Sequence, residues 1–243
     1  TDYIPAEYLP TFSANPIELN FHRIEGLAEQ FVYFNDDTFI GKPIPPERLF
    51  KKGLPRDNAR LFALRAEGLM GHIHVSDMEV INRHYRKSHV MRRLGKWFNF
   101  RYGLGDMFKT LTMMPWNFFS CFKVYHMAQP YLKSAYERMW EWEPETLDTV
   151  SRNRFRTPLD LNQSVIRFSQ LLEGEFKPHS MKDVRNIMLD DRNLPRIEKA
   201  LRSKKYSLLC FNDGDDISDP EEVKRRVNAA FQEILPEKSS YEL

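Results

Sequence analysis

Two short apolar segments, far apart in the chain, each end in an Asn-Asp pair. Residues 31–37 read FVYFNDD, and residues 206–214 read YSLLCFNDG. Short runs rich in aromatic and branched residues, bounded by polar turn residues, predict buried strands. In open α/β sheets, ligands bind outside the carboxyl ends of the strands. We therefore expect a sheet in which these polar side chains gather at a ligand-binding edge.

Helix signals accompany the two strands and place the chain in the α/β class. A cap residue, a proline and a glutamate stand in register at residues 15–18, which predicts a helix start. Helical spacing of apolar residues predicts further helices over residues 132–140, 158–174 and 220–236. The alternation of helices with buried strands is typical of an α/β protein.

Composition excludes several classes of protein. The chain has 243 residues, 42% of them hydrophobic, and 36 Lys and Arg against 34 Asp and Glu, so it is neither disordered nor strongly basic. Its two cysteines, Cys121 and Cys210, are too few for a disulfide scaffold. The sequence has no run of 18 apolar residues and no secretory leader, so we expect a cytoplasmic protein, at most in contact with the inner face of the membrane.

The acidic residues after each strand are candidate metal ligands. Asp36 and Asp37 follow the first strand directly, and Asp213 follows the second. Mg²⁺ prefers oxygen ligands and is usually shared between one or two carboxylates and the phosphates of a substrate. The alternative is a solvated turn, in which Asn and Asp side chains form local hydrogen bonds.

Four further residues have both a functional and a structural interpretation. Glu18 occupies the position of a capping glutamate. Arg154 and Arg156 precede the helix predicted to begin at Pro158, where a guanidinium and a helix N-terminus would together bind phosphate, although such arginines are commonly surface residues. His126 is a candidate general base or phosphate ligand, or an ordinary half-buried histidine.

The segment from Arg83 to Phe122 is basic and aromatic and has no clean period. Seven Lys or Arg residues lie between Arg83 and Arg101 without one acid, and aromatic residues follow. Three interpretations remain open: a helical subdomain with solvated cations, a surface that meets an anionic bilayer, and a groove for single-stranded nucleic acid.

Taken together, the segments resemble the Stealth family of sugar-phosphate transferases, which includes capsule and exopolysaccharide phosphotransferases and the lysosomal-enzyme N-acetylglucosamine-1-phosphotransferase. LPTFSANPIELNFHRIEGL at residues 9–27 and FVYFNDDTFIGKP at 31–43 are similar to the family's second conserved region. His126 and RFRTPLD at residues 154–160 resemble the third region, and LLCFNDG at 208–214 resembles the fourth. The family's earlier N-terminal conserved region is not among these segments.

The resemblance implies a fold with part of a Rossmann-like, glycosyltransferase-like sheet, a helix-rich insertion and C-terminal helices. On this basis we expect an α/β part with the NDD motif at residues 1–76, a basic and aromatic helical insertion at 77–143, and helices and a strand that complete the catalytic domain at 144–243.

It also implies an activity, the metal-dependent transfer of a hexose 1-phosphate from a UDP-sugar to a glycan hydroxyl, with Mg²⁺ or Mn²⁺ as cofactor. The acceptor would be a glycan, with a polyprenyl-linked form and peripheral membrane contact as further expectations, and nucleic acid is not an expected partner. The alternative is a truncated, non-catalytic module that binds a glycan or a membrane.

The family's functional residues carry over to named positions. They fall on Glu18, Asp37, His126, Arg156 and Asp213, which predicts Glu18, Asp37, His126 and Arg156 as catalytic residues and Asp37 and Asp213 as metal ligands. From their places in the sequence, we add Arg154, Asn35 and Asn212 as substrate-binding residues and Asp36 as a further metal ligand.

Overall fold

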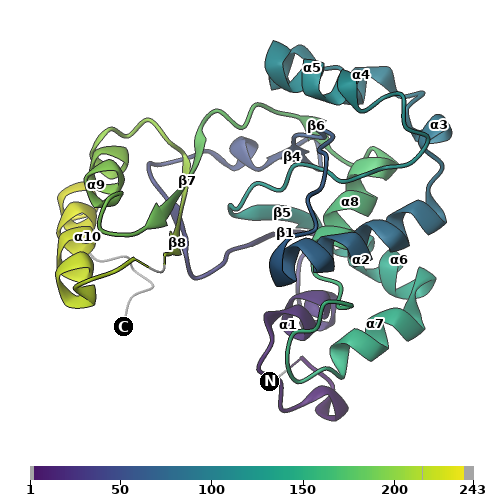
Figure 1. Cartoon of the computed structure of the whole chain (residues 1–243), viewed down its shortest axis with the longest axis horizontal. Helices are drawn as coiled ribbons and strands as arrows, with labels where there is room; N and C mark the ends of the chain where they lie inside the picture. The colour runs from purple at the N-terminus through teal and green to yellow at the C-terminus, as the bar shows by residue number, and fades with distance from the viewer. Residues whose placement is uncertain (1–2, 215, 238–243) are drawn as a thin grey trace. The chain divides into compact units, whose positions relative to one another are not determined.

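The computed structural model describes residues 3–214 and 216–237, and the chain divides into two compact units (Figure 1). Unit 1 consists of Thr1–Val32, Glu47–Val124 and Pro130–Ser180. Unit 2 consists of Tyr33–Pro46, Tyr125–Gln129 and Met181–Leu243. Each unit is therefore assembled from three separate segments of the chain.

Unit 2 is built on a three-stranded sheet in the order β2-β8-β7. Strands β7 (Val184–Leu189) and β8 (Leu208–Asp213) are parallel, and the helix α9 (Leu194–Arg202) connects them as a crossover. Strand β2 (Thr38–Ile40) pairs with β8 in the antiparallel direction. Parallel neighbours joined by a helix form the βαβ unit of Rossmann-like sheets, so the predicted α/β class is confirmed.

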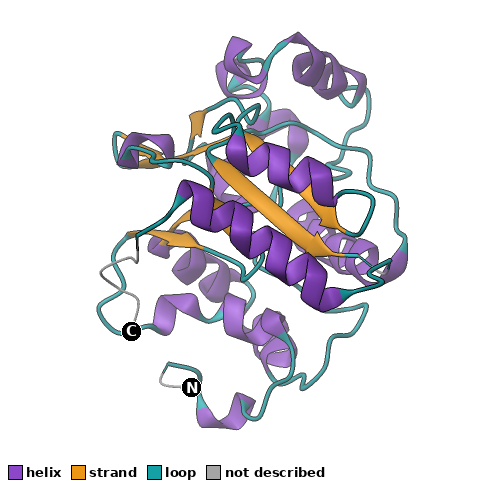
Figure 2. Ribbon diagram, turned by 90° about the vertical axis from the view of Figure 1, so that its left-hand side faces the viewer, coloured by secondary structure: helices purple, strands orange, loops and turns teal. Residues whose placement is uncertain are grey.

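Two helices cover one face of this sheet (Figure 2). Helix α10 (Pro220–Ile234) begins as its sequence predicts: Asp219 caps the helix by accepting a hydrogen bond from the backbone N–H of Glu222, and Pro220 is its first residue. The apolar residues that α9, α10 and the strands bury together are Ile187, Ile197, Ala200, Leu201, Leu209, Phe211 and Ala230. The sequence predicted β8 and α10 but not β7 or α9. It also predicted that the strand at residues 31–34 shares a sheet with β8, which is wrong, because β1 (Gln30–Tyr33) pairs with β5 (Gln129–Leu132) in a separate two-stranded sheet.

Unit 1 is mainly helical and carries two small sheets, β1-β5 and β3-β4-β6, of which β1 and β5 cross the boundaries between the units. Its strands are β1 (Gln30–Tyr33), β3 (Phe50–Lys51), β4 (Leu54–Asp57), β5 (Gln129–Leu132) and β6 (Lys177–Pro178). Its α-helices are α1 (Ala14–Leu19), α2 (Gly68–His84), α3 (Lys87–Val90), α4 (Leu94–Trp97), α5 (Leu104–Thr112), α6 (Lys133–Trp142), α7 (Pro144–Ser151) and α8 (Ser164–Glu173). Short 3-10 helices lie at Ala6–Tyr8, Phe21–Arg23, Pro46–Arg48 and Phe100–Tyr102.

The core of unit 1 surrounds α8, in which nine of the ten residues are buried. Helix α8 packs against α2 and α6, and Gly174 ends it in the left-handed conformation at φ 73°. Arg167 of α8 is buried and donates to both carboxylate oxygens of Asp57, at 2.7 and 2.9 Å. The buried charge is thus neutralised within the core.

Two predicted helix starts are wrong. The cap of α1 is Ser13, whose side chain accepts from the N–H of Asn15, so Glu18 is not at the third position and the capping interpretation of Glu18 fails. Helix α8 begins at Ser164 rather than at Pro158. Arg154 and Arg156 therefore do not stand beside the N-terminus of α8.

A turn replaces the first part of the helix predicted over residues 158–174. Asp160 accepts from the backbone N–H and the hydroxyl of Thr157, at 3.1 and 2.7 Å, and its own N–H donates to the carbonyl of Thr157. The same side-chain pair that imitates a helix cap in the sequence closes a turn in the structure. Among the described residues, no helix has the length and apolarity needed to cross a membrane.

Candidate functional site

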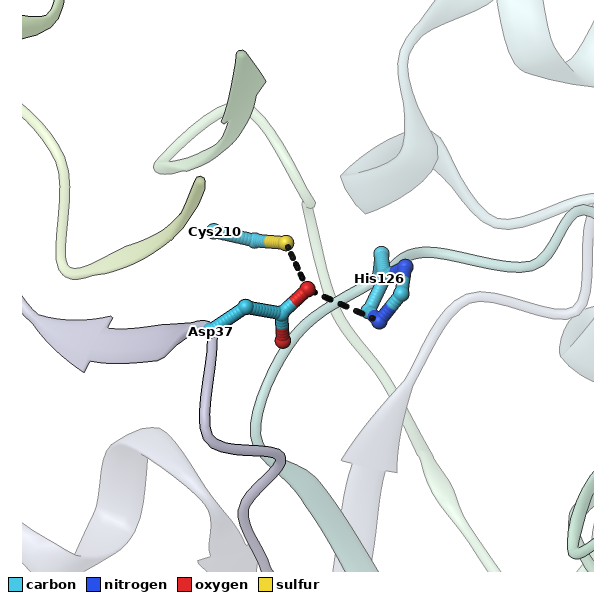
Figure 3. Close-up of side chains that lie close together, drawn as sticks. All are labelled: Asp37, His126 and Cys210. Carbon is cyan, nitrogen blue, oxygen red and sulfur yellow. Dashed lines mark hydrogen bonds and ion pairs between the residues drawn. The ribbon is translucent and has the colours of Figure 1, made fainter. Parts of the chain in front are cut away.

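Three side chains from the three segments of unit 2 meet at one place (Figure 3). They are Asp37, His126 and Cys210, and one polar atom from each lies within 4.8 Å of the others. Oδ2 of Asp37 accepts from the thiol of Cys210 at 3.3 Å and lies 3.5 Å from Nε2 of His126. Asp37 is thus the central member of the group.

The backbone of the sheet fixes Asp37 and Cys210. Cys210 is the third residue of β8, fully buried, and pairs with Thr38 of β2 on one side and with Asn186 of β7 on the other. Asp37 immediately precedes β2, and its carbonyl accepts from the N–H of Phe211 at 2.9 Å. The carboxylate is therefore held next to the middle of β8 by main-chain hydrogen bonds.

Two amide side chains hold the imidazole of His126. Nδ2 of Asn35 lies 2.9 Å from Nε2 of His126, and Nδ2 of Asn212 lies 3.4 Å from Nδ1. Asn35 sits in the turn after β1, where its carbonyl accepts from the N–H and the hydroxyl of Thr38. The structure thus brings together Asn35, Asp37, His126 and Asn212, four of the residues that the sequence predicted.

The contacts of His126 with the two amides depend on its tautomer. The Oδ1 atom of Asn212 lies 2.9 Å from Sγ of Cys210, whose single thiol proton can go to this oxygen or to Oδ2 of Asp37, and the NH₂ group of Asn212 faces Nδ1 of His126. When that NH₂ group donates to Nδ1, a neutral imidazole carries its proton on Nε2, which faces Oδ2 of Asp37 at 3.5 Å. In the other tautomer, Nε2 accepts from Nδ2 of Asn35 at 2.9 Å.

Cys210 acts in this cluster as a neutral thiol. Burial raises the pKa of Cys210 above its ordinary value, and the hydrogen bond to Asp37 and the charge of that carboxylate raise it further. A thiol that keeps its proton donates to the oxygens of Asp37 or Asn212 and is a poor metal ligand, since metals bind the thiolate.

Asp37 has one carboxylate oxygen that is open to a ligand. Its Oδ1 atom is buried and has no hydrogen-bond partner among the described residues, while its Oδ2 atom has two neighbours. A carboxylate oxygen in this position fits a hard cation or a substrate proton. Asp36 and Asp213 are exposed and lie outside the group of three.

The remaining predicted residues belong to unit 1. Glu18 is buried on α1, and the pKa of the neighbouring Tyr3 is raised to about 12, first by burial and then by the charge of Glu18. Arg154 and Arg156 are exposed on the loop between α7 and α8, and the carbonyl of Arg154 accepts from the N–H of Phe12 at 2.8 Å. The guanidinium groups of both arginines thus have no partner among the residues that the structure describes, while a main-chain hydrogen bond holds the loop.

Sequence reasoning missed Cys210 as a member of the site. The signal was present, because residues two apart on a strand point to the same face, and Cys210 stands two residues before Asn212. A predicted strand with Asn212 at a ligand-binding edge thus also places the thiol under that edge.

Comparison with known proteins places these residues in context. A family model for Stealth protein conserved region 2 matches residues 1–57. The chain is 37% identical to the receptor polysaccharide phosphotransferase WefC of Streptococcus gordonii, over 100% of this chain and 73% of the relative. It is 36% identical to the capsular polysaccharide phosphotransferase WcwK of Streptococcus pneumoniae, with the same coverage. It is 30% identical to the exopolysaccharide phosphotransferase cps2G of Lactiplantibacillus plantarum, over 98% of this chain and 71% of the relative.

Proposed function

Because the chain belongs to the Stealth family of capsular and exopolysaccharide phosphotransferases, we propose that it transfers a hexose 1-phosphate from a UDP-sugar to a hydroxyl of a glycan. The hydroxyl oxygen forms a bond to the β-phosphorus of the donor, and the bond from that phosphorus to the bridging oxygen breaks. UMP leaves with the bridging oxygen, and the hydroxyl loses its proton. The product is a phosphodiester between the hexose and the glycan.

The observation that carries this proposal is the cluster around Asp37. A buried carboxylate oxygen without a partner among the described residues stands beside a histidine that two amides orient. Such oriented polar groups are what phosphoryl transfer asks of a protein, because the reaction depends mainly on positioning and electrostatic stabilisation. The polar edge that the sequence predicts thus becomes a place where a hydroxyl and a phosphate can be held together.

Asp37 has two candidate roles at this site. Its Oδ1 atom can accept the proton of the attacking hydroxyl, with His126 beside its Oδ2 atom. It can instead hold Mg²⁺ or Mn²⁺, since a carboxylate oxygen suits both cations, whereas the protonated thiol of Cys210 suits neither. When bound, such a cation would neutralise the charge on the phosphate oxygens. Asp36 and Asp213 remain predicted as further oxygen ligands.

The residues of unit 1 enter the proposal through the family resemblance. Arg156 would bind the donor phosphates, with each charged hydrogen bond worth about 1.5–3 kcal/mol. Arg154 would assist it, and Asn35 and Asn212 would contact substrate as well as orient His126. Glu18 does not cap α1, and it remains a predicted catalytic residue.

The test is a pair of isosteric substitutions, Asp37→Asn and His126→Gln, assayed by release of UMP from UDP-sugars with a glycan acceptor. We expect turnover to fall by about 10²–10⁴-fold in Asp37→Asn, the range for loss of a group that handles protons or phosphate charge. The melting temperature should change little, because Oδ1 of Asp37 contributes no hydrogen bond to the described fold. Asp216→Asn, an exposed carboxylate of the same unit, is the matched control.

Calorimetric titration with UDP-sugar separates the two roles of Asp37. If Asp37 holds the cation, Asp37→Asn loses the Mg²⁺-dependent part of donor binding; if it accepts the proton, the variant binds the donor normally and fails only in turnover. Asp37→Asn with nearly full activity would overturn the assignment of the site. A native chain that binds glycan but turns over no donor would instead favour the non-catalytic alternative.

A further inference from the structure

Helix α5 directs polar side chains toward the protein and exposes its apolar face, which is the reverse of an ordinary surface helix. Two of its polar residues face the protein: Asp106 bonds Asn58 at 3.2 Å and Arg60 at 3.2 Å, and the buried hydroxyl of Thr110 accepts from the N–H of Leu61. A surface helix of a globular protein normally buries its apolar face and exposes its polar one. The apolar face of α5 is therefore left without a place in the core.

That apolar face is exposed along its whole length. Leu104, Phe108 and Leu111 are spaced three and four residues apart, so they share one face, and they are 75%, 66% and 54% exposed. Phe100, in the short 3-10 helix that precedes α5, is 83% exposed as well. Large apolar side chains exposed in a continuous row mark an interaction surface rather than random surface residues.

Helix α4, which precedes α5 in the chain (Figure 1), also directs a polar side chain toward the protein and exposes an apolar one. Lys96 of α4 points inward, where it donates to the carbonyls of Gly174 and Phe176 at the end of α8, whereas Leu94 is 59% exposed. Lys96 and the buried Trp97 thus anchor α4 to unit 1. Two successive helices use cations or polar groups for attachment and turn apolar groups outward.

Exposed cations accompany the exposed apolar residues. Arg86, Arg92, Arg101 and Lys109 are all exposed on α3 to α5 and their connections, and Asp106, the acid of α5, is already paired with Arg60. The exposed face therefore combines apolar side chains with positive charge. A negatively charged partner with an apolar interior complements both properties, and the surface of an anionic bilayer is such a partner.

We propose that the apolar face of α5, formed by Leu104, Phe108 and Leu111, binds the surface of an anionic lipid bilayer together with the exposed Leu94, Phe100, Arg101 and Lys109 of the same segment. The apolar side chains enter the boundary between headgroups and acyl chains, and the cations bind lipid phosphates. With nine residues, α5 is too short to span a bilayer and lies in its interface. This proposal does not depend on the catalytic role of Asp37, because the two rest on different residues.

Sedimentation of the full chain with vesicles tests the proposal. Vesicles of phosphatidylcholine with phosphatidylglycerol should bind the protein more tightly than phosphatidylcholine alone, and salt should weaken that difference. The double variant Leu104→Ser and Phe108→Ser should bind about tenfold more weakly or worse at every salt concentration. Leu235→Ser, which changes a leucine that is 57% exposed on unit 2, is the matched control and should bind as the native chain does.

Two further measurements distinguish the contributions and the alternatives. Arg101→Gln with Lys109→Gln should reduce binding to anionic vesicles alone and flatten its salt dependence. Brominated lipids should quench the fluorescence of Trp116, which is 56% exposed, and this quenching should be weaker in Trp116→Phe. Unchanged vesicle binding in the Leu104 and Phe108 double variant would overturn the proposal, as would binding of the native chain to an oligonucleotide or to a second copy of itself instead of to vesicles.

Discussion

Asp57 in unit 1 and Asp37 in unit 2 are both carboxylates shielded from solvent, but they differ in what surrounds their oxygens. Asp57 receives two hydrogen bonds from Arg167 and one from the N–H of Asn58. Asp37 receives its contacts on Oδ2 from the thiol of Cys210 and from His126, and none of the described residues bonds Oδ1. A fully bonded buried carboxylate holds the fold together, whereas one with an open oxygen is prepared for a ligand.

Arg167→Leu removes the cation that pairs with Asp57 and should have the largest effect on stability. It leaves the charge of Asp57 buried without its cation, and removal of one partner of a buried ion pair costs about 3–5 kcal/mol. Thermal and urea unfolding would measure the loss. The double variant Arg167→Leu with Asp57→Leu should recover part of it, because the uncompensated charge is gone. Equal stability of Arg167→Leu and the native chain would show that the pair is not structural.

The fold and the site were predictable from sequence to different extents. Strand β8 and helix α10 were predicted because a short apolar run and an Asp-Pro cap are local signals that the fold does not override. The start of α8 was not, because the hydrogen bond from the N–H of Thr157 to the carboxylate of Asp160 forms in this turn as it would in a capping box. Local sequence cannot distinguish these outcomes.

The orientation of α5 was beyond sequence for a different reason. Leu104, Phe108 and Leu111 stand at helical spacing in the sequence. Their spacing does not show which side of the helix contacts the protein, because the polar partners on that side decide it. Asn58 and Arg60 supply those partners from a distant segment. The site shows the same limit: Asn35 and Asn212 were individually visible in the sequence, while their meeting at His126 depends on three segments of unit 2.

Asp77 supplies an intermediate case that sharpens the comparison. It is fully buried in unit 1, where Oδ1 accepts from the N–H of Asn162 and Oδ2 lies 3.2 Å from His74. Burial raises the pKa of Asp77 from 3.8 to about 6, against the lowering effects of His74 and Asn162. The folded state therefore binds the proton more tightly than the unfolded state does, and this stabilisation is complete below pH 3.8 and lost as the pH rises to about 6.

Asp77→Asn should remove that pH dependence, because an amide imitates the protonated acid. The melting temperature of the variant relative to the native chain should rise between pH 4 and 6, by an amount that corresponds to about 1–3 kcal/mol, and stay level above pH 7. Differential scanning calorimetry across this pH range would measure it. Parallel pH profiles of the two proteins would show that Asp77 does not titrate in this range.

Cys210→Ala and Cys210→Ser test how the thiol supports the carboxylate of Asp37, and their effect on activity should be the smallest. The thiol contacts Oδ2 of Asp37 and Oδ1 of Asn212, and its proton can go to either oxygen. Loss of the thiol in Cys210→Ala should lower kcat by about three- to tenfold, equivalent to one hydrogen bond of about 0.5–1.5 kcal/mol, with KM for the donor nearly unchanged. Cys210→Ser restores a donor and should recover most of kcat, which a purely structural role would not require. If alanine and serine reduced kcat equally while the melting temperatures fell together, Cys210 would be a packing residue.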